Sequence, residues 1–259
     1  MSGKAIVITG ASGGIGAELA VQLAADGHRL ALGARREAEL EAVARRAGAN
    51  TVTIATDVTR RGDVERLRDR AIAAFGRVDV WINNAGRGIT RTVVELTDEE
   101  LDTVMAVNVK SALYGMQAIV PHFIARGDGH LINVSSFLSR VPIATYRSAY
   151  NAAKAALNAL TANLRMDLAV SHPAIHVSLV MPGLVATEFG RNAIGGIAPR
   201  PAAGAAPAQS VEDVARAIVD LIHHPVAEIY TNPAQAAVVR RYFEDVAAFE
   251  QAAREGSAR

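Results

Sequence analysis

The sequence predicts an α/β protein in which helices flank one doubly wound, parallel sheet of seven strands. Short β-type runs alternate with longer segments of helical period along most of the chain. Strands that alternate with helical crossovers form parallel sheets covered on both faces. No linker, repeat or charge block divides the 259 residues, so we expect a single domain over 1–259.

The elements follow in order along the chain. We expect strands at 5–9, 29–33, 51–56, 78–83, 130–135, 175–181 and 228–230. We expect helices near 14–26, 36–47, 60–75, 97–126, 148–171 and 210–223. Two of these helices have start signals: Thr97 and Ser210 can each cap free backbone N–H groups, and each is followed three residues later by a carboxylate.

Two segments near the end of the chain differ from this alternation. The stretch 190–209 is rich in Gly, Ala and Pro with no clear period, and we expect a mobile flap over a substrate site rather than a domain boundary. Residues 233–259 form a predicted C-terminal helical extension with a role in packing or subunit contact. Its apolar side chains fall on one side: Val238, Val239, Tyr242, Phe243, Val246 and Phe249.

Composition excludes several classes of function. Half of the residues are apolar and the net charge is +1, so the chain has no excess of positive charge that would indicate binding to nucleic acid. The absence of cysteine excludes disulfides, thiolate zinc sites and a cysteine nucleophile. The first apolar run, 5–9, is too short for a signal peptide, and no 18 apolar residues run together. We therefore expect a cytoplasmic protein with no membrane partner.

A glycine-rich turn joins the first strand to the first helix. Gly10, Gly14 and Gly16 fall in this turn, with Ser12 and Ile15 between them. Glycines permit a tight turn and close backbone approach, while free N–H groups and the helix dipole attract an anion, so the turn predicts a pyrophosphate site. The spacing differs from both the G-x-G-x-x-G fingerprint and the P-loop, and an ordinary tight turn is the alternative.

Two arginines follow the second strand. At this position a cofactor with a free ribose 2′-hydroxyl calls for Asp or Glu, whereas this chain has Arg35 and Arg36. Because a guanidinium suits a 2′-phosphate, the sequence favours NADP(H) over NAD(H). The alternative is that both arginines only open a solvated helix.

A tyrosine and a lysine four residues apart lie on one face of the predicted helix at 148–171. Tyr150 and Lys154 would stand about 5–6 Å apart at Cβ, so the lysine cation can favour the phenolate. The chain has only three lysines, at 4, 110 and 154, which makes a random surface lysine less expected here. The alternative is an ordinary exposed i,i+4 pair.

With these motifs in order, the sequence resembles the short-chain dehydrogenase/reductase family in its shorter form, over nearly the whole chain. Besides the TGxxxGxG turn and YxxxK, the matching segments are Asp57-Val58, Asn83-Asn84-Ala85-Gly86, Asn108, Ser135-Ser136, and Pro182-Gly183 with Val185 and Thr187. The resemblance implies a Rossmann-like fold and an oxidoreductase. The segments at Asp57-Val58, at Asn84-Ala85-Gly86 and at Val185 with Thr187 follow strands at their carboxyl ends, where open α/β sheets place ligands.

The resemblance also implies roles for individual residues. Asp57 and Val58 would hold the adenine, and Val185 and Thr187 would meet the nicotinamide amide. The cofactor site would further include Gly10, Ser12, Gly14, Ile15, Gly16, Arg35, Arg36, Asn84, Ala85, Gly86, Tyr150, Lys154, Pro182 and Gly183. Tyr150 would exchange a proton with the substrate oxygen, Lys154 would also hold the ribose, and Asn108 would place a water beside the lysine.

The catalytic serine is the one departure from the family pattern. Family members often have this serine 13 residues before the tyrosine, whereas Ser136 lies 14 before it, Ser135 lies 15 and Ser139 lies 11. We choose Ser136 because it closes the fifth strand, with Ser135 as a structural neighbour. Ser136 would hydrogen-bond the substrate oxygen and stabilise its developing charge.

The substrate is predicted only as a class. The expected pocket lining is mostly apolar, which favours a hydrophobic ketone or secondary alcohol: Phe137, Leu138, Tyr146, Leu184 and Phe189. Arg147 could recognise an acid or face solvent, and solvent is favoured. No metal site is expected, because Pro173 separates His172 from His176 and the His223-His224 pair points to different faces.

The leading hypothesis is an NADP(H)-dependent carbonyl reductase or alcohol dehydrogenase that acts on a small molecule. The alternative from another class is a catalytically silent nucleotide-sensing or regulatory protein, which the set Ser136, Tyr150, Lys154 and Asn108 argues against. A carbohydrate epimerase or dehydratase is disfavoured because the chain lacks the length of those substrate domains. The family resemblance further implies a homodimer or homotetramer.

Overall fold

A computed structural model describes residues 3–196 and 207–256 of the chain. Its seven strands form one parallel sheet in the order β3-β2-β1-β4-β5-β6-β7, which confirms the predicted doubly wound α/β fold. The strands are β1 (Ala5–Thr9), β2 (Arg29–Ala34), β3 (Thr51–Ala55), β4 (Val80–Asn83), β5 (Gly129–Val134), β6 (Ile175–Met181) and β7 (Glu228–Tyr230).

The fourth strand is shorter than the 78–83 expected from the sequence. The backbone N–H of Val78 donates to the ring of His122 instead of joining the sheet. The carboxylate of Asp79 accepts from the N–H of Ala5 and forms ion pairs with Arg77 and Arg126. Polar side chains therefore take both backbone groups of Val78, whereas the N–H and carbonyl of Asp79 still bond to the backbones of Ala5 and His130 just before β4 begins.

Helices cover both faces of the sheet. They are α1 (Gly14–Ala25), α2 (Glu37–Ala47), α3 (Arg61–Phe75), α4 (Asp98–Met105), α5 (Ser111–Arg126), α6 (Ser148–Ala169), α7 (Val211–His223), α8 (Gln235–Glu244) and α9 (Val246–Arg254). The capping box at Thr97 is confirmed, and the Ser210 hydroxyl accepts from the N–H of Asp213 as expected.

The predicted helix over 97–126 is interrupted. Between α4 and α5, residues Ala106–Lys110 form a π-helical stretch, η1, which contains Asn108. The side chain of Asn108 donates to the carbonyl of Val104 four residues earlier and to that of Arg87. The Asn108 side chain thus bonds to a main-chain carbonyl within the π-helical stretch, where the turn is wider than in an α-helix. The hydrophobic period of the sequence does not reveal such an interruption.

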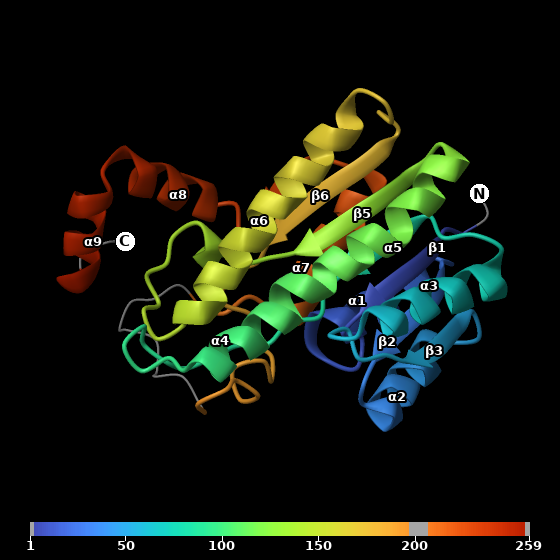
Figure 1. Cartoon of the computed structure of the whole chain (residues 1–259), viewed down its shortest axis with the longest axis horizontal. Helices are drawn as coiled ribbons and strands as arrows, with labels where there is room; N and C mark the ends of the chain where they lie inside the picture. The colour runs from blue at the N-terminus through green and yellow to red at the C-terminus, as the bar shows by residue number, and fades with distance from the viewer. Residues whose placement is uncertain (1–2, 197–206, 257–259) are drawn as a thin grey trace.

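The core has two main parts, one on each face of the sheet. Helices α1, α2 and α7 pack their buried side chains on one face, and α3, α5 and α6 pack theirs on the other (Figure 1). Trp81, in β4, and Phe123, in α5, are the largest fully buried side chains, and both belong to the second part. The sheet is therefore held rigidly, and its carboxyl edge positions the loops that carry the motifs.

The C-terminal extension forms two helices rather than one amphipathic segment. α8 and α9 lie beyond the carboxyl ends of β5 and β6 (Figure 1). Asp245 is extended between them, and its side chain caps α9 by accepting from the N–H of Ala248. Because of this break, Phe243 and Val246 are exposed, whereas the other predicted apolar residues pack together against Phe137 and Val141.

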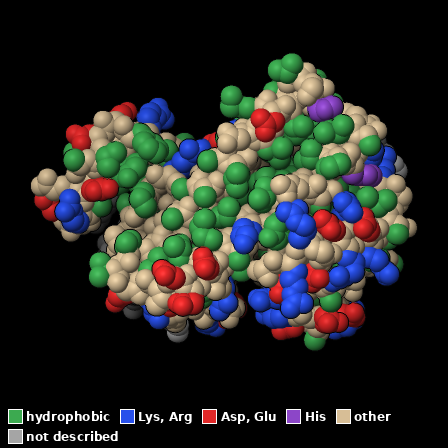
Figure 2. Space-filling view, viewed as in Figure 1, with side chains coloured by type: hydrophobic (Ala, Val, Ile, Leu, Met, Phe, Trp, Pro, Cys, Tyr) green, Lys and Arg blue, Asp and Glu red, His purple; other side chains and the backbone are tan. Residues whose placement is uncertain are grey.

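Surface side chains are unevenly distributed. On the face seen in Figure 2, hydrophobic side chains gather over α5 and α6, whereas Lys, Arg, Asp and Glu gather over α2 and α3. Exposed apolar residues on the two helices include Ile124, Met166 and Val170. Within the described ranges, no helix has the length and apolarity needed to span a bilayer. Half of the predicted flap at 190–209, namely 197–206, lies outside the described residues, as do 257–259 of the extension.

Candidate active site

The glycine-rich turn lies where β1 meets α1. Gly10 and Gly14 have φ angles of +67° and +53°, in the left-handed region that favours glycine. Helix α1 begins at Gly14, and no side chain caps it. Its first N–H groups therefore lack a side-chain acceptor, and together with the helix dipole they suit an anion.

The segment after β4 is bonded to this turn. The Asn84 side chain donates to the carbonyls of Thr9 and Gly10, and the Thr9 hydroxyl accepts from the N–H of Asn84 at 3.0 Å. A Cβ added at Gly16 would lie 2.6 Å from the Gly10 oxygen and from the Asn84 amide nitrogen. The structure thus brings Asn84 and Ala85 against the turn, and Gly16 is required by the close approach of two backbones.

Arg36 lies over the turn, and Arg35 does not. The Arg36 guanidinium donates to the hydroxyl of Ser12 at 3.1 Å and to its carbonyl at 3.2 Å. It also pairs with Glu39 at 3.6 Å. Arg35 is exposed. At the next strand, the Asp57 carboxylate accepts from the N–H and hydroxyl of Thr59, and Val58 packs on the core.

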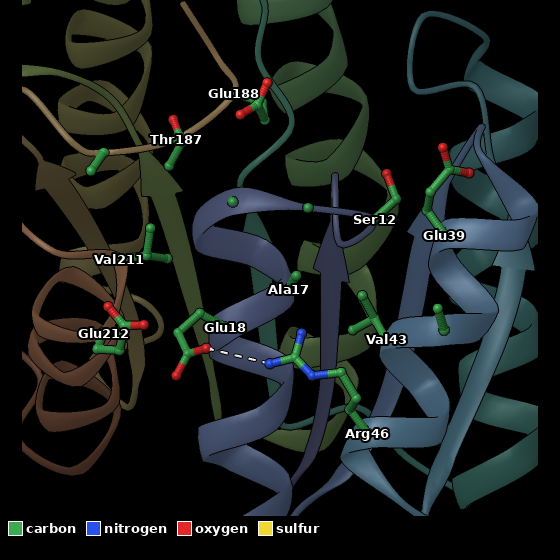
Figure 3. A pocket seen from close by; sticks show the side chains of 14 residues that line it. Ser12, Ala17, Glu18, Glu39, Val43, Arg46, Thr187, Glu188, Val211 and Glu212 are labelled. Atoms are coloured by element: carbon green, nitrogen blue, oxygen red, sulfur yellow. Dashed lines mark ion pairs between the residues drawn. The ribbon is translucent and has the colours of Figure 1, made fainter.

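A cleft of about 500 Å³ borders the turn (Figure 3). Ser12, Gly14 and Thr187 line it, together with α1 and α2 residues that include an ion pair of 3.9 Å between Glu18 and Arg46. Neither Tyr150 nor Lys154 lines this cleft. It is an opening beside the predicted pyrophosphate turn and lies apart from the predicted proton-transfer residues.

Tyr150 and Ser136 meet at the carboxyl end of β5. Tyr150 is only 9 % exposed and lies in the first turn of α6, packed among apolar residues that include Ile89 and Val104. Burial raises the pKa of the Tyr150 phenol, while a hydrogen bond with Ser136 and the positive charge of Arg147 oppose this rise. Of the three candidate serines, only Ser136 is among the groups that shift the pKa of this phenol, and its catalytic role stays a prediction.

Ser135 has a separate role, as expected for a structural neighbour. Its hydroxyl donates to the side-chain oxygen of Asn158 at 2.6 Å. Asn158 in turn donates to the hydroxyl of Ser139 at 2.7 Å. Asn158 thus fixes the segment that carries Ser136. Sequence reasoning missed it, although its position eight residues after Tyr150, on the same face of α6, is a usable signal.

Lys154 and Asn108 converge on Gly86. A Cβ at Gly86 would lie 3.0 Å from the Asn108 side-chain oxygen and 3.6 Å from the Lys154 nitrogen. The Lys154 nitrogen also lies 5.8 Å from the centre of the Tyr150 ring. Burial lowers the pKa of Lys154 to about 7. This lysine is therefore not an exposed surface partner of the tyrosine but a desolvated amine in the interior.

The segment after β6 lies across the turn and the tyrosine. Thr187 approaches Gly14, whose added Cβ would lie 3.4 Å from the Thr187 methyl group. Val185 packs on the core and pairs with Gln209. Gly183, which follows Pro182, is so close to Gln235 of α8 that a Cβ there would collide with it. The structure thus brings Thr187 beside the turn, and its contact with the nicotinamide stays a prediction.

The predicted pocket lining is only partly brought together. The Phe189 ring packs edge-on against the Tyr150 ring, with 5.6 Å between centroids. Phe137 instead packs with Val141 and Phe249 beneath the C-terminal helices, and Leu184 is 55 % exposed. The prediction that Phe137 lines a pocket is wrong, because the extension provides a better apolar environment for its side chain.

The expectation that Arg147 faces solvent is also wrong. The side chain is half buried, and its guanidinium donates to the carbonyl of Ile89 at 3.1 Å and lies over the Tyr146 ring. Arg147 is the N-cap residue of α6, three positions before Tyr150. Its place three residues before Tyr150 is the sequence signal that could have predicted a position near the phenol.

A group of possible metal ligands lies away from this site. Asp26, His28 and His223 hold ligand atoms within 4.8 Å of one another. However, Nδ1 of His28 accepts a hydrogen bond from the N–H of Lys4, which puts the imidazole proton on Nε2. Nε2 is then a donor rather than a ligand, so this geometry does not support a metal assignment.

Comparison with known proteins agrees with the geometry. The family model described as short chain dehydrogenase matches residues 4–195. The chain belongs to the short-chain dehydrogenase family. An uncharacterised oxidoreductase of Staphylococcus saprophyticus is 38 % identical over 187 residues, which span 72 % of this chain and 76 % of the relative.

Solved structures of other short-chain dehydrogenases have the same fold. One from Burkholderia phymatum, in complex with NAD, is 28 % identical with a TM-score of 0.85, over 95 % of both chains. An alcohol dehydrogenase from Thermococcus sibiricus, complexed with 5-hydroxy-NADP, is 29 % identical with a TM-score of 0.76, over 88 % of this chain and 95 % of that one. The protein is therefore an oxidoreductase of the short-chain dehydrogenase type.

Proposed function

We propose that the protein transfers hydride between NADP(H) and a hydrophobic ketone or secondary alcohol, with Tyr150 as general acid and base. The observation that carries this proposal is the meeting of Tyr150, Ser136 and Lys154 at the end of β5, next to the segments bonded to the glycine-rich turn. The apolar side chains around Tyr150 favour a hydrophobic substrate.

The residues at the turn fit a dinucleotide. The uncapped N-terminus of α1 and the two left-handed glycines suit a pyrophosphate, and the Arg36 guanidinium beside Ser12 suits a 2′-phosphate. Since one solved relative holds NAD and another holds 5-hydroxy-NADP, the preference for NADP(H) rests on Arg36 and its neighbour Arg35. Asp57, Val58, Val185 and Thr187 remain our predicted contacts to the adenine and the nicotinamide.

The chain's own groups then have defined tasks. When bound, the nicotinamide supplies or accepts the hydride at the carbonyl carbon. In reduction, the Tyr150 hydroxyl gives its proton to the carbonyl oxygen; in oxidation, the phenolate takes it from the alcohol. The Ser136 hydroxyl holds the same oxygen, and Lys154 and Asn108 border the path by which the proton is replaced.

Turnover by a phenylalanine variant tests the proposal. We expect Tyr150→Phe to keep the fold and NADPH binding and to lose turnover by about 10²–10⁴-fold, since a positioned acid is worth that much. A panel of apolar ketones and alcohols, followed by absorbance of the reduced nicotinamide, measures it with both cofactors. Tyr114→Phe, in α5 and away from the site, is the matched control. Equal turnover in Tyr150→Phe and wild type would remove Tyr150 from the acid–base role.

We also infer a homodimer or homotetramer. The exposed apolar side chains on α5 and α6, including Met166 and Val170, support association through these helices. Sedimentation of the wild type and of a Met166→Glu, Val170→Glu variant measures it. A monomeric wild type would contradict the inference.

A further inference from the structure

Arg147 is held close to Tyr150 by the loop that precedes α4. Arg147 is the N-cap residue immediately before α6, and Tyr150 lies in the first turn of that helix. The bond of 3.1 Å from the Arg147 guanidinium to the Ile89 carbonyl restrains the cation in this position. A surface arginine without such a bond would sample many rotamers in water.

The guanidinium lies on the side of Tyr150 that Phe189 covers. A Cβ at Gly88 would lie 2.8 Å from an Arg147 guanidinium nitrogen and 3.0 Å from the Phe189 ring. Arg147 and Phe189 therefore flank Gly88 together, and the Phe189 ring is the one that packs against Tyr150. Within residues 3–196 and 207–256, no ion pair is formed by Arg147, so its charge is not neutralised by a carboxylate there.

The other charged groups near Tyr150 have different partners. On α6, Lys154 donates to the Val134 carbonyl at 2.8 Å. On the segment that carries Phe189, Glu188 is 68 % exposed and pairs with Arg191 at 2.9 Å. Arg87, on the segment after β4, has its backbone bonded to Asn108. Arg91, whose backbone bridges that of Arg147, pairs with Glu100 of α4 at 3.1 Å. The hydrophobic side chains packed with Tyr150 include Val104, Val109 and Ala153.

We propose that Arg147 is a positioning residue of the proton-transfer site, whose permanent charge stabilises the phenolate form of Tyr150. The proposal rests on the proposed function of Tyr150. It adds a second cation to the lysine charge expected from the sequence, because burial lowers the pKa of the Lys154 amine to about 7, within the neutral pH range. A guanidinium stays charged throughout this range, and Arg147 lowers the pKa of Tyr150 against the effect of burial.

Nuclear magnetic resonance of labelled tyrosine tests the proposal. The chain has five tyrosines, so a carbon label at the oxygen-bearing ring position gives few signals, and Tyr150→Phe assigns one of them. The midpoint of its pH titration, with saturating NADP⁺, is compared between wild type, Arg147→Gln and Arg147→Lys. Gln keeps a donor for the Ile89 carbonyl but has no charge, whereas Lys keeps the charge.

We expect the midpoint of Tyr150 to rise by about 1 pH unit in Arg147→Gln and to stay closer to wild type in Arg147→Lys. Arg191→Met, which removes an exposed arginine near the site, is the matched control and should leave the midpoint unchanged. A midpoint in Arg147→Gln within a few tenths of wild type would overturn the proposal. If that variant does not fold, Arg147→Met is judged by the same criterion.

The failure of this inference is distinguishable from that of the proposed function. If Tyr150→Phe loses turnover while Arg147→Gln titrates like wild type, only the role of Arg147 is wrong. If Tyr150→Phe retains full turnover, or Tyr150 does not titrate in the folded wild type with NADP⁺ bound, both are wrong. The rate of alcohol oxidation is also measured against pH. If the pKa of its acidic limb rises in Arg147→Gln together with the titration midpoint of Tyr150, the roles of Arg147 and of Tyr150 are both supported.

Discussion

The ammonium nitrogen of Lys154 lies 2.8 Å from the carbonyl oxygen of Val134, the last residue of β5. The lysine thus satisfies a main-chain acceptor at the strand end, beside the segment that carries Ser136. This bond orients the amine, but a single neutral acceptor does not compensate for the water that burial removes.

The buried amine should make the stability of the protein depend on pH. Its pKa falls from 10.5 to about 7 on folding, so between these values the unfolded chain binds more protons than the folded one. The free energy of unfolding contributed by Lys154 therefore rises with pH across this window, by at most about 1.4 kcal/mol per pH unit. Urea unfolding of the cofactor-free wild type and Lys154→Met measures the difference, with exposed Lys110→Met as control. Parallel pH dependences would contradict the shift.

Arg36 and Arg35 should differ in their effect on cofactor choice. Since Arg36 is placed against Ser12 of the turn, we expect Arg36→Ala to weaken NADPH binding by about 10-fold or more and NADH binding much less. Arg35→Ala should have a smaller effect on NADPH, because among the described residues Arg36, and not Arg35, is hydrogen-bonded to the turn. Titration of reduced-nicotinamide fluorescence measures both constants. Equal loss of NADPH and NADH binding in Arg36→Ala would be inconsistent with a 2′-phosphate contact.

Two glycine-to-alanine substitutions should have opposite effects on stability. In Gly16→Ala the new methyl group would meet two atoms at 2.6 Å, which should destabilise the fold by about 1–3 kcal/mol and weaken cofactor binding. In Gly62→Ala, on α3, the methyl group meets nothing within 4 Å, and the gain in helix propensity should stabilise the fold by about 0.5–1 kcal/mol. Urea unfolding compares them. A harmless Gly16→Ala would mean that the turn and the Asn84 segment separate easily.

His130 should make the protein sensitive to acid. Burial is the main cause that lowers its pKa from 6.5 to about 3, so between these values the unfolded chain binds more protons. Stability should therefore fall as pH falls through this window, by at most about 1.4 kcal/mol per pH unit from this residue. His130→Leu should weaken that dependence, whereas His172→Gln, outside the sheet, should not. Unfolding followed between these pH values measures it, and an unchanged dependence in His130→Leu would show that another group is responsible.

Much of the fold could be predicted from the sequence, because the signals are local. The glycine turn, the strand ends and the helix caps each depend on residues close in the chain, and Ser136 was separated from Ser135 by its place at the end of β5. The roles of these residues stay predictions. Their placement at one edge of the sheet follows from its parallel order.

The parts that could not be predicted depend on contacts between distant segments. Phe137 was expected in the pocket, but it is buried by Phe249, which lies more than one hundred residues later. Arg147 was expected in solvent, but the carbonyl that holds it belongs to Ile89. The apolar pattern of the sequence continues through Asp245 and predicts one helix. The chain instead breaks there, because the Asp245 side chain caps the start of α9.

The π-helical stretch rotates the side-chain faces of α5 about the helix axis relative to those of α4. One extra residue within a turn rotates everything after it by about 100° relative to an unbroken α-helix. Deleting a single residue from Ala106–Lys110 would therefore act as a rotation rather than a shortening. The core face of α4 around Val104 and that of α5 around Met116 could not both remain against their partners. The number of residues between α4 and α5 thus sets the angle between their core faces, and Asn108 lies within this stretch.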